Sequence, residues 1–136
     1  MIISHKNLPS TTLTVLVVED NPQFRQLISD FLAFAGYRVI SAVNAIEALT
    51  ILRQTDPLPD LIITDIKMTP MDGCEFFSAV RTQWAKIPLI MMSTSISFEA
   101  SCPDIALNPE AYMTKPFSYE ELIRVIESIL LASKGG

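Results

Sequence analysis

Near the middle of the chain the sequence reads Asp60-Leu-Ile-Ile-Thr-Asp65-Ile-Lys-Met-Thr-Pro-Met-Asp72-Gly73. Its apolar run, Leu61 to Ile63, is short and continuous, as in strands that are buried on both faces of a parallel sheet. The run ends on the carboxylate of Asp65, and loop and turn residues follow from Thr69 onward. Because ligands of open α/β sheets bind beyond the carboxyl ends of the strands, Asp65 is a candidate site residue.

The composition predicts a single globular domain. The chain has 136 residues, of which 49% are hydrophobic and 18% charged, with 9 Pro and 4 Gly; this suffices for a core and argues against disorder. The net charge is −5 and the 10 basic residues are scattered, so we expect no direct binding to nucleic acid. No apolar run approaches the roughly 20 residues of a membrane span, so we expect no membrane partner.

The cysteines and the N-terminal residues predict a location and a boundary. Cys74 and Cys102 match no metal or redox spacing, which favours reduced thiols in a cytoplasmic protein. Residues 1–12 show no signal-cleavage pattern, and we expect a flexible lead-in followed by one domain over residues 13–133. The single histidine, His5, lies in this lead-in, so histidine-based catalysis within the chain is not expected.

Strand-like and helix-like segments alternate along the chain. The expected strands cover residues 13–18, 37–42, 61–65, 87–92 and 112–114. Helices are expected from Pro22 behind an Asn21 N-cap, behind Asn44, over residues 75–84, as a short helix from Pro103, and behind a Ser118–Glu121 capping box. This alternation predicts an α/β fold with a five-stranded, doubly wound parallel sheet and helices on both faces.

Polar residues stand at the ends of four of these strands. Glu19 and Asp20 follow the first strand, Asp65 ends the third, Ser93 follows the fourth, and Lys115 follows the fifth. The carboxyl ends of parallel strands lie on one edge of the sheet. We therefore expect three carboxylates, a hydroxyl and an ammonium to converge there.

This set of groups suits phosphoryl chemistry. Close carboxylates raise each other's pKa values unless a cation lies among them, and oxygen ligands without His or Cys favour Mg²⁺ over zinc. A carboxylate beside Mg²⁺ can attack phosphorus and form an acyl phosphate. Mg²⁺, the Lys115 ammonium, and the Ser93 hydroxyl with backbone N–H groups can then bind the three equatorial oxygens.

Several motifs together resemble the receiver domain of two-component response regulators, of the kind found in chemotaxis regulators. They are Glu19-Asp20 after a hydrophobic strand, Asp65-x-x-Met68 with Met71-Asp72-Gly73, Ile87-Pro88 before Ser93, and Tyr112-x-x-Lys115-Pro116-Phe117. The match covers residues 13 to 133. It implies the (βα)5 flavodoxin-like receiver fold with strand order 2-1-3-4-5.

The resemblance implies that Asp65 is the phosphoacceptor. The donor is then a phosphohistidine on a sensor histidine kinase or a histidine phosphotransfer protein. Asp20, Asp65 and the Lys67 backbone carbonyl would ligate Mg²⁺, with Glu19 acting through water.

The resemblance also implies a switch rather than an enzyme. Lys115 binds the phosphoryl group, the Ser93 hydroxyl moves toward it, and the Tyr112 ring turns inward. An output partner, an output domain or a second copy in a homodimer reads the change at the face of the fourth helix, fifth strand and fifth helix. The only reactions catalysed are the protein's own phosphoryl transfer and dephosphorylation. The Lys115-Pro116 bond can take the cis form usual in the family.

Some residues depart from the family pattern. Pro70 comes one place later than usual, Thr94 replaces a smaller residue, and Asn108-Pro109 replaces a Gly-Ala pair. Pro103 shortens the fourth helix. We expect a differently bent loop beside Asp65 and an atypical partner or dimer face.

Two other function classes stay open. One is a pseudo-receiver, a protein-binding module of this fold that works without phosphate. The other is a phosphohydrolase with an aspartyl nucleophile, which the presence of Lys67 instead of a second Asp disfavours. The sequence leaves open whether the domain stands alone or belongs to a larger protein.

Overall fold

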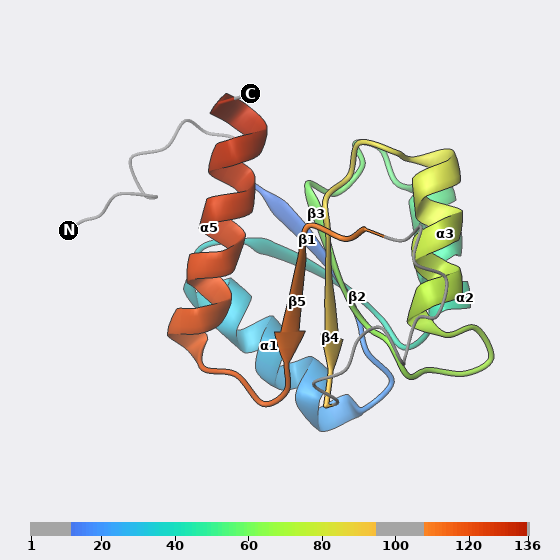
Figure 1. Cartoon of the computed structure of the whole chain (residues 1–136), viewed down its shortest axis with the longest axis horizontal. Helices are drawn as coiled ribbons and strands as arrows, with labels where there is room; N and C mark the ends of the chain where they lie inside the picture. The colour runs from blue at the N-terminus through green and yellow to red at the C-terminus, as the bar shows by residue number, and fades with distance from the viewer. Residues whose placement is uncertain (1–11, 95–107, 136) are drawn as a thin grey trace.

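The computed structural model describes residues 12–94 and 108–135. They form a five-stranded parallel sheet in the order β2-β1-β3-β4-β5, with helices on both of its faces (Figure 1). The predicted fold class and strand order are confirmed. The expected short helix from Pro103, the atypical face built on it and nearly all of the expected lead-in lie outside the described residues.

The strands agree with the predicted segments to within two residues at either end. They are β1 Thr14–Val18, β2 Arg38–Ala42, β3 Leu61–Asp65, β4 Leu89–Ser93 and β5 Ala111–Thr114. Every residue of β3 and β4 is buried, as expected for inner strands of a parallel sheet. Both edge strands, β2 and β5, are partly exposed.

Two helical layers cover the sheet. The described helices are α1 Pro22–Phe34, α2 Ala45–Gln54, α3 Gly73–Gln83 and α5 Tyr119–Gly135. Because successive strand residues point to opposite faces, Val15 and Val17 pack in a cluster with side chains of α1 and α5, whereas Leu16 and Val18 pack with α2 and α3. Figure 1 shows the same division, with α1 and α5 on one side of the sheet.

Helix caps direct the chain from the strand ends into α1 and α5. The Asn21 side chain accepts a hydrogen bond from the Phe24 N–H at 2.9 Å, and Pro22 opens α1. Ser118 and Glu121 exchange the two bonds of a capping box before α5. These predicted starts of α1 and α5 are therefore confirmed.

Helix α3 begins two residues earlier than expected. Asp72 is its N-cap and forms a capping box with Glu75, so Gly73 is already helical. The sequence suggested a turn at Asp72-Gly73 because both residue types also favour turns. The early start brings the first turn of α3 against the end of β3.

The expectation of reduced thiols is wrong for Cys74, which is disulfide-bonded. Sequence spacing failed here because a disulfide depends on the distance between two Cα atoms in space, not on their separation along the chain. Cys102, the other cysteine of the chain, lies outside the described residues.

The helices described here do not include one with the length and apolar character needed to cross a membrane.

Candidate functional site

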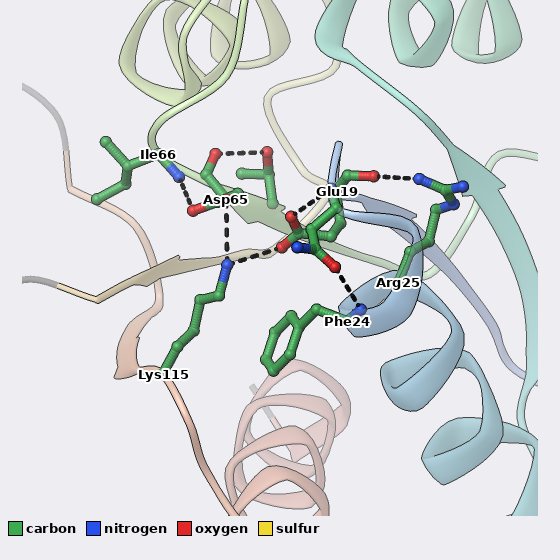
Figure 2. A network of polar contacts seen from close by, with 8 residues as sticks. Glu19, Phe24, Arg25, Asp65, Ile66 and Lys115 are labelled. Carbon is green, nitrogen blue, oxygen red and sulfur yellow. Dashed lines mark hydrogen bonds and ion pairs between the residues drawn. The ribbon is translucent and has the colours of Figure 1, made fainter.

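The carboxyl ends of β1, β3 and β5 bring Glu19, Asp65 and Lys115 together (Figure 2). The Lys115 ammonium donates to Glu19 Oε1 at 3.0 Å and to Asp65 Oδ2 at 3.2 Å. The side chains are exposed by only 0% for Glu19, 10% for Asp65 and 13% for Lys115. Such sheltered charges depend on each other, because removal of one partner leaves the others uncompensated.

Backbone donors hold the remaining carboxylate oxygens. The Asn21 N–H donates to Glu19 Oε2 at 2.9 Å, and the Ile66 N–H donates to Asp65 Oδ1 at 2.9 Å. Arg25 Nη1 also donates to the backbone carbonyl of Glu19 at 2.7 Å. Both carboxylates are therefore fixed in orientation before any ligand arrives.

Asp20 completes an acidic cluster on the same edge. One carboxylate oxygen each from Glu19, Asp20 and Asp65 lies within 4.8 Å of the others. Glu19 and Asp65 are buried, whereas Asp20 is exposed and can be reached from solvent. An all-oxygen donor set of this kind fits a hard divalent cation such as Mg²⁺.

Both ends of the buried ion pair have raised pKa values, but for different reasons. Burial raises the pKa of Glu19, and the Asn21 N–H and the Lys115 ammonium offset that rise only in part. Burial alone would lower the pKa of Lys115, but its hydrogen bond to Glu19 and the negative charges of Asp65 and Glu19 outweigh burial and raise it. The ammonium therefore stays charged at neutral pH, at a site rich in carboxylates.

The other predicted site residues occupy the same edge with different exposure. Ser93 ends β4 and is buried, and the Lys115 N–H donates to its carbonyl at 2.8 Å. Tyr112, in β5, is 41% exposed. Lys67 lies in the loop after β3 and is exposed. The Lys115-Pro116 peptide bond is cis, as the resemblance implied.

The loop after Asp65 returns tightly to the strand that it leaves. Its Thr69-Pro70 peptide bond is cis, and the Gly73 N–H donates to the Ile66 carbonyl at 2.7 Å. A Cβ at Gly73 would clash with the backbone carbonyl oxygen of Asp65 and lie 2.7 Å from Ile66 Cα. The absence of a side chain at Gly73 thus lets the start of α3 pack against the backbone of Asp65. The interpretation of Gly73 as a turn residue did not predict this role.

Three residues of the site's surroundings come from the start of α1 and had no predicted role there. Asn21 and Arg25 both donate hydrogen bonds to Glu19. The third residue is Phe24, whose ring centroid lies 4.5 Å from Lys115 Nζ. The sequence marked Asn21 as a helix cap and Phe24 as a core-facing residue, and only their position just after Glu19-Asp20 pointed to the site. Figure 2 shows the side chain of Lys115 reaching toward both carboxylates beside the Phe24 ring.

Comparisons with known proteins point to one protein family. The family model described as the response regulator receiver domain matches residues 15–127. The probable transcriptional regulatory protein TcrX of Mycobacterium tuberculosis is 25% identical over 118 residues, which cover 87% of this chain and 50% of TcrX. The chain spans about half or less of the length of the curated relatives it matches first.

Solved structures of shorter proteins match over nearly their whole length. The chemotaxis response regulator CheY4 of Vibrio cholerae is 34% identical, with a TM-score of 0.79 and coverage of 88% of this chain and 99% of CheY4. The response regulator TrrA of Thermotoga maritima, solved in complex with Mg²⁺-BeF, is 26% identical with a TM-score of 0.76 and coverage of 86% and 98%. With its acidic cluster on the sheet edge, the chain belongs to the response regulator receiver domain family of two-component systems.

Proposed function

We propose that this domain is a phosphorylation-controlled switch in which Asp65 accepts a phosphoryl group from a phosphohistidine. The donor is a sensor histidine kinase or a histidine phosphotransfer protein. The observation that supports this most directly is the Lys115 ammonium, held between Glu19 and Asp65 at 3.0 and 3.2 Å. A cation fixed beside a carboxylate is suited to bind a phosphoryl oxygen once that carboxylate carries one.

The proposed transfer needs no general base, because a carboxylate is ionised at neutral pH. A carboxylate oxygen of Asp65 forms a bond to phosphorus, the bond from phosphorus to the imidazole nitrogen breaks, and the electron pair stays on the imidazole. Mg²⁺, when bound, would neutralise charge on the phosphoryl oxygens. The residues proposed to hold it are Asp20, Asp65, the Lys67 carbonyl and, through water, Glu19.

The chain's own groups are proposed to read the phosphoryl group. Lys115 moves its hydrogen bond from Asp65 to a phosphoryl oxygen, and the Ser93 hydroxyl turns toward another. Tyr112, which is 41% exposed, turns inward as Ser93 moves. The altered surface around β5 and α5 is then read by an output partner, an output domain or a second copy.

We place the domain at residues 13–133, and we propose that it acts as a regulator, with no catalysis beyond its own phosphorylation and dephosphorylation. A cytoplasmic location is proposed because relatives such as TcrX are described as transcriptional regulators, and such proteins act where the DNA is.

The test is Mg²⁺-dependent phosphorylation by acetyl phosphate and by a phosphorylated histidine kinase, followed by intact mass. We expect one added phosphoryl group on the wild type and none on Asp65→Asn. A wild type that takes up no phosphoryl group from either donor would favour the pseudo-receiver. Continuous turnover of small phosphoesters would favour the phosphohydrolase.

A further inference from the structure

The ammonium of Lys115 has a third neighbour besides its two carboxylates. The ring centroid of Phe24 lies 4.5 Å from Lys115 Nζ, within the roughly 6 Å at which a cation is attracted to the face of an aromatic ring. The Lys115 side chain is only 13% exposed, and such interactions strengthen when the cation is shielded from water. The ring therefore lies beside a charge that the proposed chemistry uses.

The position of Phe24 is fixed by its backbone and by the packing of its ring. The Phe24 N–H donates to the side chain of Asn21 at 2.9 Å, which fixes the first turn of α1. The ring packs edge-on against Phe117, with centroids 5.6 Å apart and planes at 76°. Phe117 is buried in the same apolar cluster against which Phe24 packs. Phe24 thus offers a preorganised surface rather than a mobile side chain.

These contacts form a closed ring of interactions around the Lys115 ammonium. Lys115 donates to Glu19, Glu19 accepts from the Asn21 N–H, Asn21 accepts from the Phe24 N–H, and the Phe24 ring faces Lys115. Two of these contacts, those of Glu19 and Phe24 with Lys115, join the end of β1 and the start of α1 to the residue that follows β5 (Figure 2). The start of α1 therefore helps to determine where the ammonium can lie.

We infer that Phe24 is a positioning residue for phosphoryl transfer, whose ring face holds the Lys115 ammonium against Asp65 by a cation–π interaction. This inference rests on the proposed function. The two carboxylates accept hydrogen bonds from the ammonium, and the Phe24 ring is its third neighbour. With the ring beside it, the ammonium is held near Asp65, where a phosphoryl oxygen would form, so less reorganisation is needed at the moment of transfer.

The ring's electron density can be changed without changing its packing. We would replace Phe24 site-specifically by mono-, di- and trifluorophenylalanine, in which fluorine withdraws electron density from the ring face. The rate of phosphorylation by acetyl phosphate at saturating Mg²⁺ should fall stepwise along the series. The affinity for beryllofluoride, which mimics the phosphoryl group, should fall in parallel. Phe24→Leu, which removes the ring, should lower both by roughly three- to tenfold.

Phe31 provides a matched control on the same helix. It packs edge-on against Tyr119 with centroids 5.6 Å apart and planes at 77°, almost the geometry of Phe24 with Phe117, but within the described ranges no Lys or Arg lies over its ring. Trifluorophenylalanine at Phe31 should leave the phosphorylation rate and the beryllofluoride affinity unchanged. Thermal unfolding of every variant checks that the fold is retained.

The outcomes separate this inference from the proposed function. If the wild type accepts no phosphoryl group, the proposed function itself fails. If the wild type is phosphorylated but the fluorinated series at Phe24 shows a constant rate, the ring serves packing alone and the inference is wrong, even if Phe24→Leu is slow. An equal loss from fluorination at Phe31 would also overturn it.

Discussion

At the scale of single residues, Glu19 is a carboxylate that solvent does not reach. Its side chain is 0% exposed, and burial raises its pKa. The folded state therefore favours the neutral form more than the unfolded chain does. The stability from this preference is fully present below about pH 4.5, the usual value for the group, and is lost as the pH rises through the higher pKa of the folded protein.

This shift predicts a pH-dependent effect of Glu19→Gln, which cannot ionise. In metal-free buffer, the free energy of unfolding of the variant relative to wild type should increase as the pH rises from 4.5 toward neutrality. Urea unfolding at several pH values measures this difference. A difference that stays constant with pH would show that the carboxyl of Glu19 titrates alike in both states.

Gly73 is a second residue on which the site depends. Because a Cβ there would clash with the carbonyl of Asp65 and the Cα of Ile66, Gly73→Ala must push α3 away from the phosphoacceptor candidate. We expect a loss of about 1–3 kcal/mol in the free energy of unfolding and slower phosphorylation of Asp65. Urea unfolding and the acetyl phosphate assay measure the two effects.

Ser78→Ala is the control for that substitution, since Ser78 is exposed on the same helix. It should change the free energy of unfolding by less than about 0.5 kcal/mol. If Gly73→Ala changed the free energy of unfolding as little as Ser78→Ala, the close packing of Gly73 against the end of β3 would be contradicted.

At the scale of elements, the edge of the sheet opposite the site is tied by its own polar contacts. Glu110 accepts from Arg81 Nη2 at 2.6 Å and from the Leu89 N–H at 2.8 Å. Arg81 also donates to the Ile87 carbonyl at 2.8 Å. These bonds join the end of α3 to the starts of β4 and β5, far along the strands from Asp65.

We therefore expect Glu110→Ala to affect stability but not phosphorylation. The Arg81–Glu110 side chains are 25% and 38% exposed, so the ion pair itself contributes little. Together with the lost acceptor for Leu89, the change should cost about 1 kcal/mol in urea unfolding. Glu110→Gln, which retains an acceptor oxygen, should cost less. A slower phosphorylation of either variant would mean that the two edges are coupled.

Sequence patterns predicted the elements well where one local rule decided them. Asn21 and Ser118 began helices because their side chains can accept the orphan N–H groups of a first turn. Asp72 carried the same signal, but its neighbour Gly73 also suited a turn, and only the packing against β3 favoured the helix. Cys74 shows the limit of spacing arguments, because its disulfide depends on the folded arrangement.

At the scale of the whole molecule, the gathering of Glu19, Asp20, Asp65 and Lys115 could be foreseen because a parallel sheet puts all its carboxyl ends on one edge. The distances and orientations could not. They depend on backbone donors such as the Ile66 N–H and on the ring of Phe24, which helical periodicity predicts as a core-facing residue but not as a neighbour of Lys115. The sequence thus predicted which groups meet, whereas their hydrogen bonds required the fold.

Cation binding should stabilise the entire fold. Mg²⁺ would relieve repulsion among the three carboxylates, and at a hundredfold excess over its Kd it would add about 2.7 kcal/mol to the free energy of unfolding. The melting temperature should therefore rise in millimolar Mg²⁺ compared with Na⁺ at equal ionic strength, and Asp20→Asn should remove most of the rise. A melting temperature that Mg²⁺ leaves unchanged would contradict a metal site here.

The central claim is that Asp65 carries the acyl phosphate, and chemical trapping tests it most directly. Borohydride reduces an aspartyl phosphate to homoserine, so the modified position can be found by peptide mass spectrometry after treatment with acetyl phosphate and Mg²⁺. We predict homoserine at residue 65 and at no other aspartate, dependent on Mg²⁺. Homoserine at a different position, or none in a protein that is otherwise folded and binds Mg²⁺, would contradict the proposed switch.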